Sequence, residues 1–144
     1  MRVIVQIAQN AKCVVDNKVT GSIDFGYMLL VGFKEGDDIN TINKMIKKIV
    51  NLRIFKDEAG KMNLNIKQVN GKILSISQFT LYANTNEGNR PSFIGALSGE
   101  KSSVLYDEFN KLLSKEVEVQ TGIFGAEMEI SFTNMGPCTI SLEF

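Results

Sequence analysis

The sequence predicts an α+β fold in which a strand-dominated, curved or barrel-like sheet carries two main helices. Short apolar runs bounded by polar turn residues recur along the chain, and they outnumber the segments with helical periodicity. Only two segments repeat apolar residues at the three-to-four spacing of an amphipathic helix. No repeat, low-complexity run or Pro/Gly-rich linker divides the 144 residues, so residues 1–144 are expected to form one domain.

The first third of the chain is expected to form strands. Residues 2–8 form the first strand, and residues 12–15 and 18–20 form a hairpin that turns at Asp16-Asn17. Residues 27–32 are continuously apolar, which is typical of a strand covered on both faces.

The first helix is predicted from the N-cap candidates Asp37 and Asp38 to about Asn51. Its apolar positions share one face, and they are Ile39, Ile42, Met45, Ile46, Ile49 and Val50. The lysines of the same segment, Lys44, Lys47 and Lys48, are expected to face water.

Strands are next predicted at residues 53–55 and 62–64, joined by a turn at 57–60, and then at residues 73–79. About twenty residues follow, Thr80 to Gly99, with little periodicity and many Asn, Gly and Ser. A loop of that length in a compact domain is usually functional or mobile.

The last third of the chain is predicted to hold the second helix and the closing strands. The helix runs from about Glu100 to Lys115, and its inward side chains are expected to be Val104, Leu105, Phe109, Leu112 and Leu113. Three closing strands are predicted, at Val117–Thr121, Glu127–Thr133 and Cys138–Phe144.

The absence of histidine excludes several kinds of chemistry. A chain without histidine cannot build a Ser-His or Cys-His nucleophile pair, nor a His-ligated zinc or iron site. Cys13 and Cys138 lie 125 positions apart, so they form no zinc-ligand motif and are expected to be free thiols. We therefore expect no metal and no cofactor. So few cysteines indicate a reducing compartment, and the lack of an 18-residue apolar run favours a cytoplasmic protein without a membrane segment.

The net charge of zero conceals an asymmetry. Residues 34–72 hold nine basic and five acidic side chains, a net charge of +4, and the rest of the chain is at −4. A solvated helix face is the simpler explanation. The alternative is an anion-facing side suited to a few phosphates rather than to a long duplex, so no DNA partner is expected.

Few conventional catalytic motifs occur. There is no GxGxxG, Walker A or GxSxG pattern. Ser98 and Lys101 match an S-x-x-K pair, but Ser98 and Glu100 fit the N-terminus of the second helix better.

Two other segments are candidates for function. Ser77–Tyr82 ends a strand, where free N–H groups can hold an oxyanion, although a half-exposed strand rich in Ser and Thr would look similar. Gly136-Pro137 predicts a tight turn with bare carbonyls, for which an ordinary hairpin turn is the alternative.

Together these two segments resemble a known family. Ser77-Gln78-Phe79-Thr80-Leu81 matches the SQFTL signature of the D-aminoacyl-tRNA deacylases, and Asn134-Met135-Gly136-Pro137-Cys138-Thr139 is similar to their NxGPxT signature. The resemblance extends over the whole chain, and it includes Asn51–Phe55, Gly60–Leu64, Arg90–Phe93 and Thr121–Ala126.

The resemblance implies a homodimeric enzyme that binds the 3′ end of aminoacyl-tRNA and hydrolyses the ester that joins a D-amino acid, or glycine, to the terminal adenosine. It implies that Ser77, Gln78, Phe79 and Thr80 form the catalytic pocket floor, with Met128 and Ala96 against the substrate. It also implies that Gly136 and Pro137 form a cis peptide that one subunit inserts into the other subunit's pocket, where its crowded carbonyls reject L-amino acids.

The mechanism expected from these residues needs no imidazole. Backbone N–H groups near Phe79 and Thr80 stabilise the oxyanion, and water attacks with help from the ribose 2′-OH of the substrate. A covalent role for Thr80 is the rival, but the sequence shows no base beside it. Three alternatives to the function stay open: a related deacylase for a small L-amino acid, a tRNA-end or protein-binding module without catalysis, and a structural domain.

Overall fold

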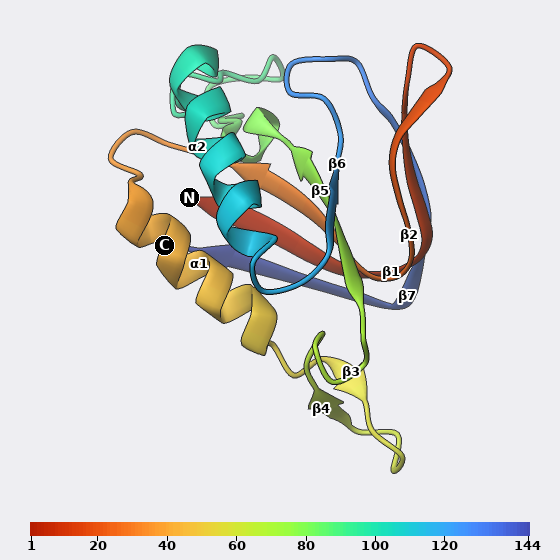
Figure 1. The fold of residues 1–144 in the computed structure, drawn as a ribbon. Helices are drawn as coiled ribbons and strands as arrows, with labels where there is room; N and C mark the ends of the chain where they lie inside the picture. The colour runs from red at the N-terminus through yellow and green to blue at the C-terminus, as the bar shows by residue number, and fades with distance from the viewer.

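The computed structural model describes all 144 residues, and the sheet in it carries both helices on one face (Figure 1). Five strands form a mixed sheet in the order β6-β5-β2-β1-β7. Their bounds are β1 Arg2–Val15, β2 Lys18–Gly32, β5 Lys72–Ser77, β6 Val119–Thr121 and β7 Glu129–Glu143. The α+β, strand-dominated class is confirmed, but the sheet is open, with β6 and β7 at its edges, and does not close into a barrel.

The hairpin of β1 and β2 turns where the sequence predicts it. Val15 pairs with Lys18, and Asp16 and Asn17 adopt φ angles of 48° and 62°, as a two-residue hairpin turn requires. The two strands are longer than predicted, because pairing continues past the polar segment around Asn10 up to Arg2.

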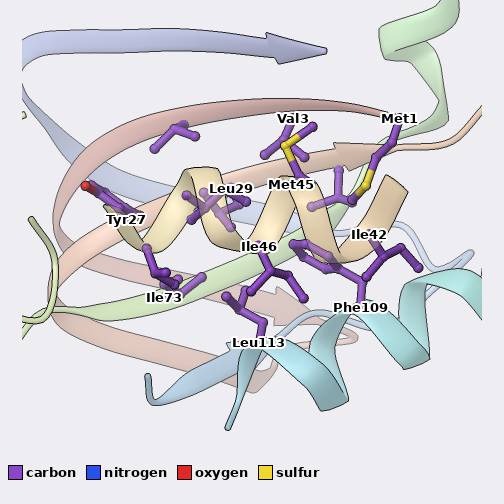
Figure 2. Packing of buried hydrophobic residues seen from close by; sticks show 14 of the residues in the cluster. Met1, Val3, Tyr27, Leu29, Ile42, Met45, Ile46, Ile73, Phe109 and Leu113 are labelled. Atoms are coloured by element: carbon purple, nitrogen blue, oxygen red, sulfur yellow. The ribbon is translucent and has the colours of Figure 1, made fainter. Parts of the chain in front are cut away.

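The central strand β2 is buried on both faces, as the apolar run predicts. Tyr27, Leu29 and Val31 belong to the larger core cluster, which faces the helices, whereas Met28 belongs to a second cluster on the other face. Figure 2 shows the larger cluster, in which side chains of both helices meet those of the sheet.

Helix α1 (Ile39–Asn51) confirms the predicted cap and the predicted apolar face, except that Ile39 in its first turn is exposed. The carboxylate of Asp38 accepts a hydrogen bond of 2.9 Å from the amide of Thr41. The buried side chains are Ile42, Met45, Ile46, Ile49 and Val50, while all three lysines of the helix are exposed. A small hairpin follows, β3 (Phe55–Lys56) with β4 (Met62–Leu64), near the predicted strands.

Helix α2 (Gly99–Leu113) confirms four of the five expected inward residues, since Phe109 and Leu113 are buried and Leu105 and Leu112 pack against the core. Its buried side chains are Ser102, Tyr106, Phe109 and Leu113. The prediction that Val104 points inward is wrong, since its side chain is 67% exposed. The four buried positions recur at steps of four, three and four residues, which leaves Val104 on the opposite side of the helix.

The C-terminal segments also differ from the prediction. The two strands expected at residues 127–133 and 138–144 are a single strand, β7, and both halves pair with β1 in the same direction, through Thr133 with Gln9 and Thr139 with Gln6. Gly136-Pro137 is therefore not a hairpin turn. It lies in an irregularity of an edge strand, where the register between β1 and β7 shifts. No helix of the structure is long and apolar enough to cross a membrane.

Candidate active site

The main cavity lies where two neighbouring parallel strands end. The pairing of Leu30 with Ile76 and of Val31 with Ser77 brings the carboxyl ends of β2 and β5 together. A cavity of about 610 Å³ opens there. Its wall is formed by residues 30–33, 76–79, Phe93, 96–99, Ser102, 124–126, Met128 and Ile130.

The structure places most of the expected site residues at this cavity. Ser77, Gln78 and Phe79 line it directly, and Ala96 and Met128 line it from two other segments. Thr80 lies beside the wall rather than in it, and its hydroxyl accepts a hydrogen bond from the side-chain amide of Gln78. Gly136 and Pro137 are not among the wall residues of this chain.

The short helix η1 (Phe79–Tyr82) begins at the cavity wall, directly after β5. The amide of Gln78 donates a hydrogen bond of 2.7 Å to the carbonyl of Val31, so this residue is still tied to β2. The next two amides, those of Phe79 and Thr80, open η1, and the first N–H groups of a helix have no partner within the helix. Two neighbouring N–H donors are therefore available at the end of the strand.

Gly32 allows this close approach of the two strand ends. A Cβ atom at Gly32 would lie 2.8 Å from the carbonyl oxygen of Gln78, which is closer than van der Waals contact permits. A side chain at position 32 would therefore displace the segment that carries these amides.

The loop between η1 and α2 contributes Phe93 and residues 96–98 to the cavity wall. Its two halves are joined by a bridge between Asn84 and Ser92, which exchange two hydrogen bonds of 2.8 Å. The loop positions the ring of Phe93 edge-on to the ring of Phe79, with centroids 5.0 Å apart. Phe79 remains 54% exposed, so this part of the wall presents an aromatic surface to solvent.

No residue in the cavity wall has an ionisable side chain, and the polar ones are Ser77, Gln78, Ser98 and Ser102. Behind the wall, the hydroxyl of Tyr106 donates a hydrogen bond of 2.8 Å to the carbonyl of Ser75, and burial raises the pKa of Tyr106. Burial also raises the pKa of Cys138, which keeps the thiol neutral. No group of three or more Cys, Asp or Glu side chains is arranged to hold a metal ion. An acid or base from the wall of this chain is therefore not available.

Gly136 and Pro137 are exposed on β7, and the peptide bond between them is cis. The side chain of Thr139 braces this segment. Its hydroxyl donates to the carbonyl of Pro137 over 3.3 Å, and it accepts hydrogen bonds of 3.2 Å from the side-chain amides of Gln6 and Asn134. The segment is thus held by side chains while its outer surface stays uncovered.

The sequence did not indicate two parts of the wall. Val31 and Gly32 belong to the apolar run 27–32, whose pattern indicates only a buried strand, and no motif marks Phe33 or Ser102. A usable signal was present, since an apolar strand, a helix and another apolar strand predict a parallel crossover with a crevice at the strand ends.

A cavity that combines backbone N–H donors with a wall devoid of ionisable groups suits a hydrolase acting on an already activated ester. The comparisons with known proteins agree with this class. The family model described as D-Tyr-tRNA(Tyr) deacylase matches residues 4–143, so the chain belongs to this family of ester hydrolases.

Two relatives named D-aminoacyl-tRNA deacylase, from Lactobacillus gasseri and Lactobacillus acidophilus, are each 51% identical to this chain over 144 residues, which is 99% of both chains. Among solved structures, one titled c-Myc DNA Unwinding Element Binding Protein is 34% identical with a TM-score of 0.94, covering 100% of this chain and 99% of its own. A second, titled a probable eukaryotic D-amino acid tRNA deacylase, is 16% identical with a TM-score of 0.85 over 98% and 97% of the chains, which shows the fold alone.

Proposed function

We propose that the protein hydrolyses the ester between a D-amino acid, or glycine, and the 3′-terminal adenosine of tRNA, and that two copies of the chain complete each active site. The pair of amides that open η1, at Phe79 and Thr80 beside the cavity, is the observation that carries this proposal. The volume of about 610 Å³ lies within the range of small-ligand sites and accommodates an aminoacyl-adenosine end rather than a whole tRNA.

The chemistry follows from the donors that are present. Water attacks the ester carbonyl, and the amides of Phe79 and Thr80 stabilise the negative charge that develops on the carbonyl oxygen. The bond between the acyl carbon and the 3′ oxygen then breaks, the 3′ oxygen takes a proton, and the free amino acid and tRNA leave. Since the wall supplies no base, the 2′-OH of the substrate is the group that assists the attacking water.

Chiral selection is assigned to Gly136 and Pro137. These residues lie outside the cavity of their own chain and are exposed, as a segment that enters a neighbouring subunit must be. Carbonyl oxygens of this rigid segment would hold the α-ammonium of the substrate. An L side chain would then clash with the segment, whereas a D side chain would point away from it.

The solved relative whose title names a DNA element raises the question of a DNA partner. In this chain the formal net charge is zero, and a surface that binds a long duplex needs many phosphate contacts. A short RNA end is therefore the ligand we propose, and the absence of a DNA partner stays a prediction. A tRNA substrate also favours a cytoplasmic location.

The proposal is tested by measuring amino acid release from D-Tyr-tRNA, L-Tyr-tRNA and Gly-tRNA. Release from the D-Tyr and Gly substrates, with L-Tyr-tRNA left intact, is expected. Release from the L-aminoacyl substrate alone would favour the related L-specific deacylase, and retention of tRNA without release would favour a binding module. A sedimentation measurement that finds only a monomer under assay conditions would contradict the shared active site.

A further inference from the structure

A second concave surface lies on the outer side of α1, and its character is cationic. It is lined by Lys44, Lys47, Lys48, Asn51, Leu52, Arg53 and Phe144. All four cationic side chains are exposed, and no aspartate or glutamate side chain lines the surface. We call it the α1 groove.

No ion pair with an aspartate or glutamate side chain compensates the positive charge of the α1 groove. Ion pairs engage Arg2, Lys34, Lys67, Lys72, Lys101 and Lys111, but none of the four groove cations. Helix α1 contains no acidic residue, so the i,i+4 pairs that usually neutralise exposed lysines cannot form. The Nε of Arg53 donates a hydrogen bond of 2.8 Å to the carbonyl of Asn63. This acceptor is neutral, so the positive charge of Arg53 remains.

The helix that carries the α1 groove begins a few residues after the cavity wall. Phe33 lies in the cavity wall, and residues 34–38 lead from it directly to the N-cap at Asp38. At about 1.5 Å per residue, Lys44 lies about 9 Å and Lys48 about 15 Å along the helix from Asp38. That length corresponds to about four stacked nucleotides at roughly 3.4 Å each.

We propose that the α1 groove binds backbone phosphates of the tRNA acceptor stem while the 3′-terminal ester lies in the cavity. This inference rests on the proposed function. An aminoacyl end is followed by a few unpaired nucleotides and then by a double helix, so the phosphates of the stem lie a few nucleotides away from the ester. Lysines one helical turn apart suit successive phosphates, since an ammonium group contacts phosphate as a point charge without base specificity.

The test compares two double variants that each remove two positive charges. Lys44→Ala/Lys48→Ala alters the groove, and Lys12→Ala/Lys18→Ala is the matched control. The control lysines are exposed and form no ion pair, and they lie near the turn of the β1–β2 hairpin, away from α1 (Figure 1). Each variant is assayed on D-Tyr-tRNA and on the minimal ester D-tyrosyl-adenosine, at 50 and 200 mM salt.

For the groove variant we expect the KM for D-Tyr-tRNA at 50 mM salt to rise about tenfold, with kcat unchanged and with D-tyrosyl-adenosine cleaved as by the wild type. The slope of log(1/KM) against log salt should become shallower by about two, because each phosphate contact contributes about one unit. The control variant should match the wild type on both substrates.

Equal effects of the two double variants, or an unchanged KM for D-Tyr-tRNA in the groove variant, would overturn the inference. A rise in KM for D-tyrosyl-adenosine equal to the rise for D-Tyr-tRNA would also overturn the inference, because the lysines would then affect binding in the cavity rather than binding of the stem. If the wild type cleaves D-tyrosyl-adenosine and the groove variant has the wild-type KM for D-Tyr-tRNA, the proposed function stands and only this inference fails. If the wild type cleaves neither substrate, both fail.

Discussion

The sulfur atom of Met128 lies against the backbone of Gly122, where an added Cβ atom would come within 2.4 Å of it. The same Cβ would lie 3.1 Å from a methyl carbon of Ile76 and 3.2 Å from the sulfur of Cys13. Met128 is also part of the cavity wall. The absence of a side chain at position 122 therefore determines where the Met128 side chain lies in the candidate active site.

Gly122→Ala is expected to push the Met128 side chain toward the cavity. We expect the free energy of unfolding to fall by about 1–3 kcal/mol, as for other overpacked sites, and kcat/KM for D-Tyr-tRNA to fall with it. Urea denaturation and the release assay measure the two effects. The double variant Gly122→Ala/Met128→Ala should lose less unfolding free energy than the two single variants lose together. A loss equal to that sum would show that the two residues do not compete for space.

Thr80→Ala is expected to retain measurable activity, because water rather than the hydroxyl attacks the ester. Thr80 is the second residue of η1, and alanine keeps its backbone amide as a donor. Single-turnover release from D-Tyr-tRNA is the measurement, with Thr85→Ala in the adjoining loop as the control. Complete loss of release, with tRNA binding intact, would support a covalent threonine instead.

Gly136→Ala is expected to impair deacylation of D-Tyr-tRNA or the rejection of L-Tyr-tRNA. Gly136 has a φ of 112°, which alanine rarely adopts, and a Cβ there would lie 2.9 Å from the amide nitrogen of Cys138. The exposed segment must therefore change shape. Thr133→Ala, an exposed position on the same strand, is the control. Normal rates and normal rejection in the Gly136 variant would refute the assignment of chiral selection to this segment.

The pH profile should contain no inflection from an enzyme side chain between about pH 5 and 8. The chain has no histidine, and the cavity wall has no ionisable group. Burial raises the pKa values of Tyr106 and Cys138, so both lose their protons only above their usual range and stay neutral throughout this window. The measurement is kcat/KM for substrates that differ in the pKa of their α-ammonium. An inflection that stays at one pH for all of them would reveal an enzyme group and contradict the scheme.

Tyr106→Phe should lower the free energy of unfolding by about 0.5–1.5 kcal/mol, because the Ser75 carbonyl loses a buried hydrogen bond. Tyr82→Phe is the matched control. The hydroxyl of Tyr82 is buried and makes no hydrogen bond of ordinary length, although the carboxylate of Glu143 lies near it, so its removal should cost less than removal of the Tyr106 hydroxyl. Thermal or urea unfolding distinguishes the two, and equal losses would show that the Tyr106 hydrogen bond is not the cause.

Local features of the fold could be predicted because their causes lie within a few residues. The cap at Asp38, the buried face of α1 and the turn at Asp16-Asn17 depend on neighbouring hydrogen bonds and on periodicity. The inner face of α2 was harder to predict. Val104 fits an apolar helical pattern, yet Ser102 and Tyr106 take the inward positions, since the hydroxyl of Tyr106 finds an acceptor in β5.

The sequence by itself determined the family, through residues 77–81 and 134–139, and it excluded any imidazole chemistry. Only the tertiary structure decided how the site is assembled. Parallel pairing of β2 with β5 brings Val31 beside Ser77. Pairing of β7 with β1 alone places Gly136-Pro137 on an edge strand, outside the cavity of its own chain. Pairing of this kind depends on burial between residues far apart in the chain. A local pattern specifies which residues form a strand, but it does not specify which strand lies beside it.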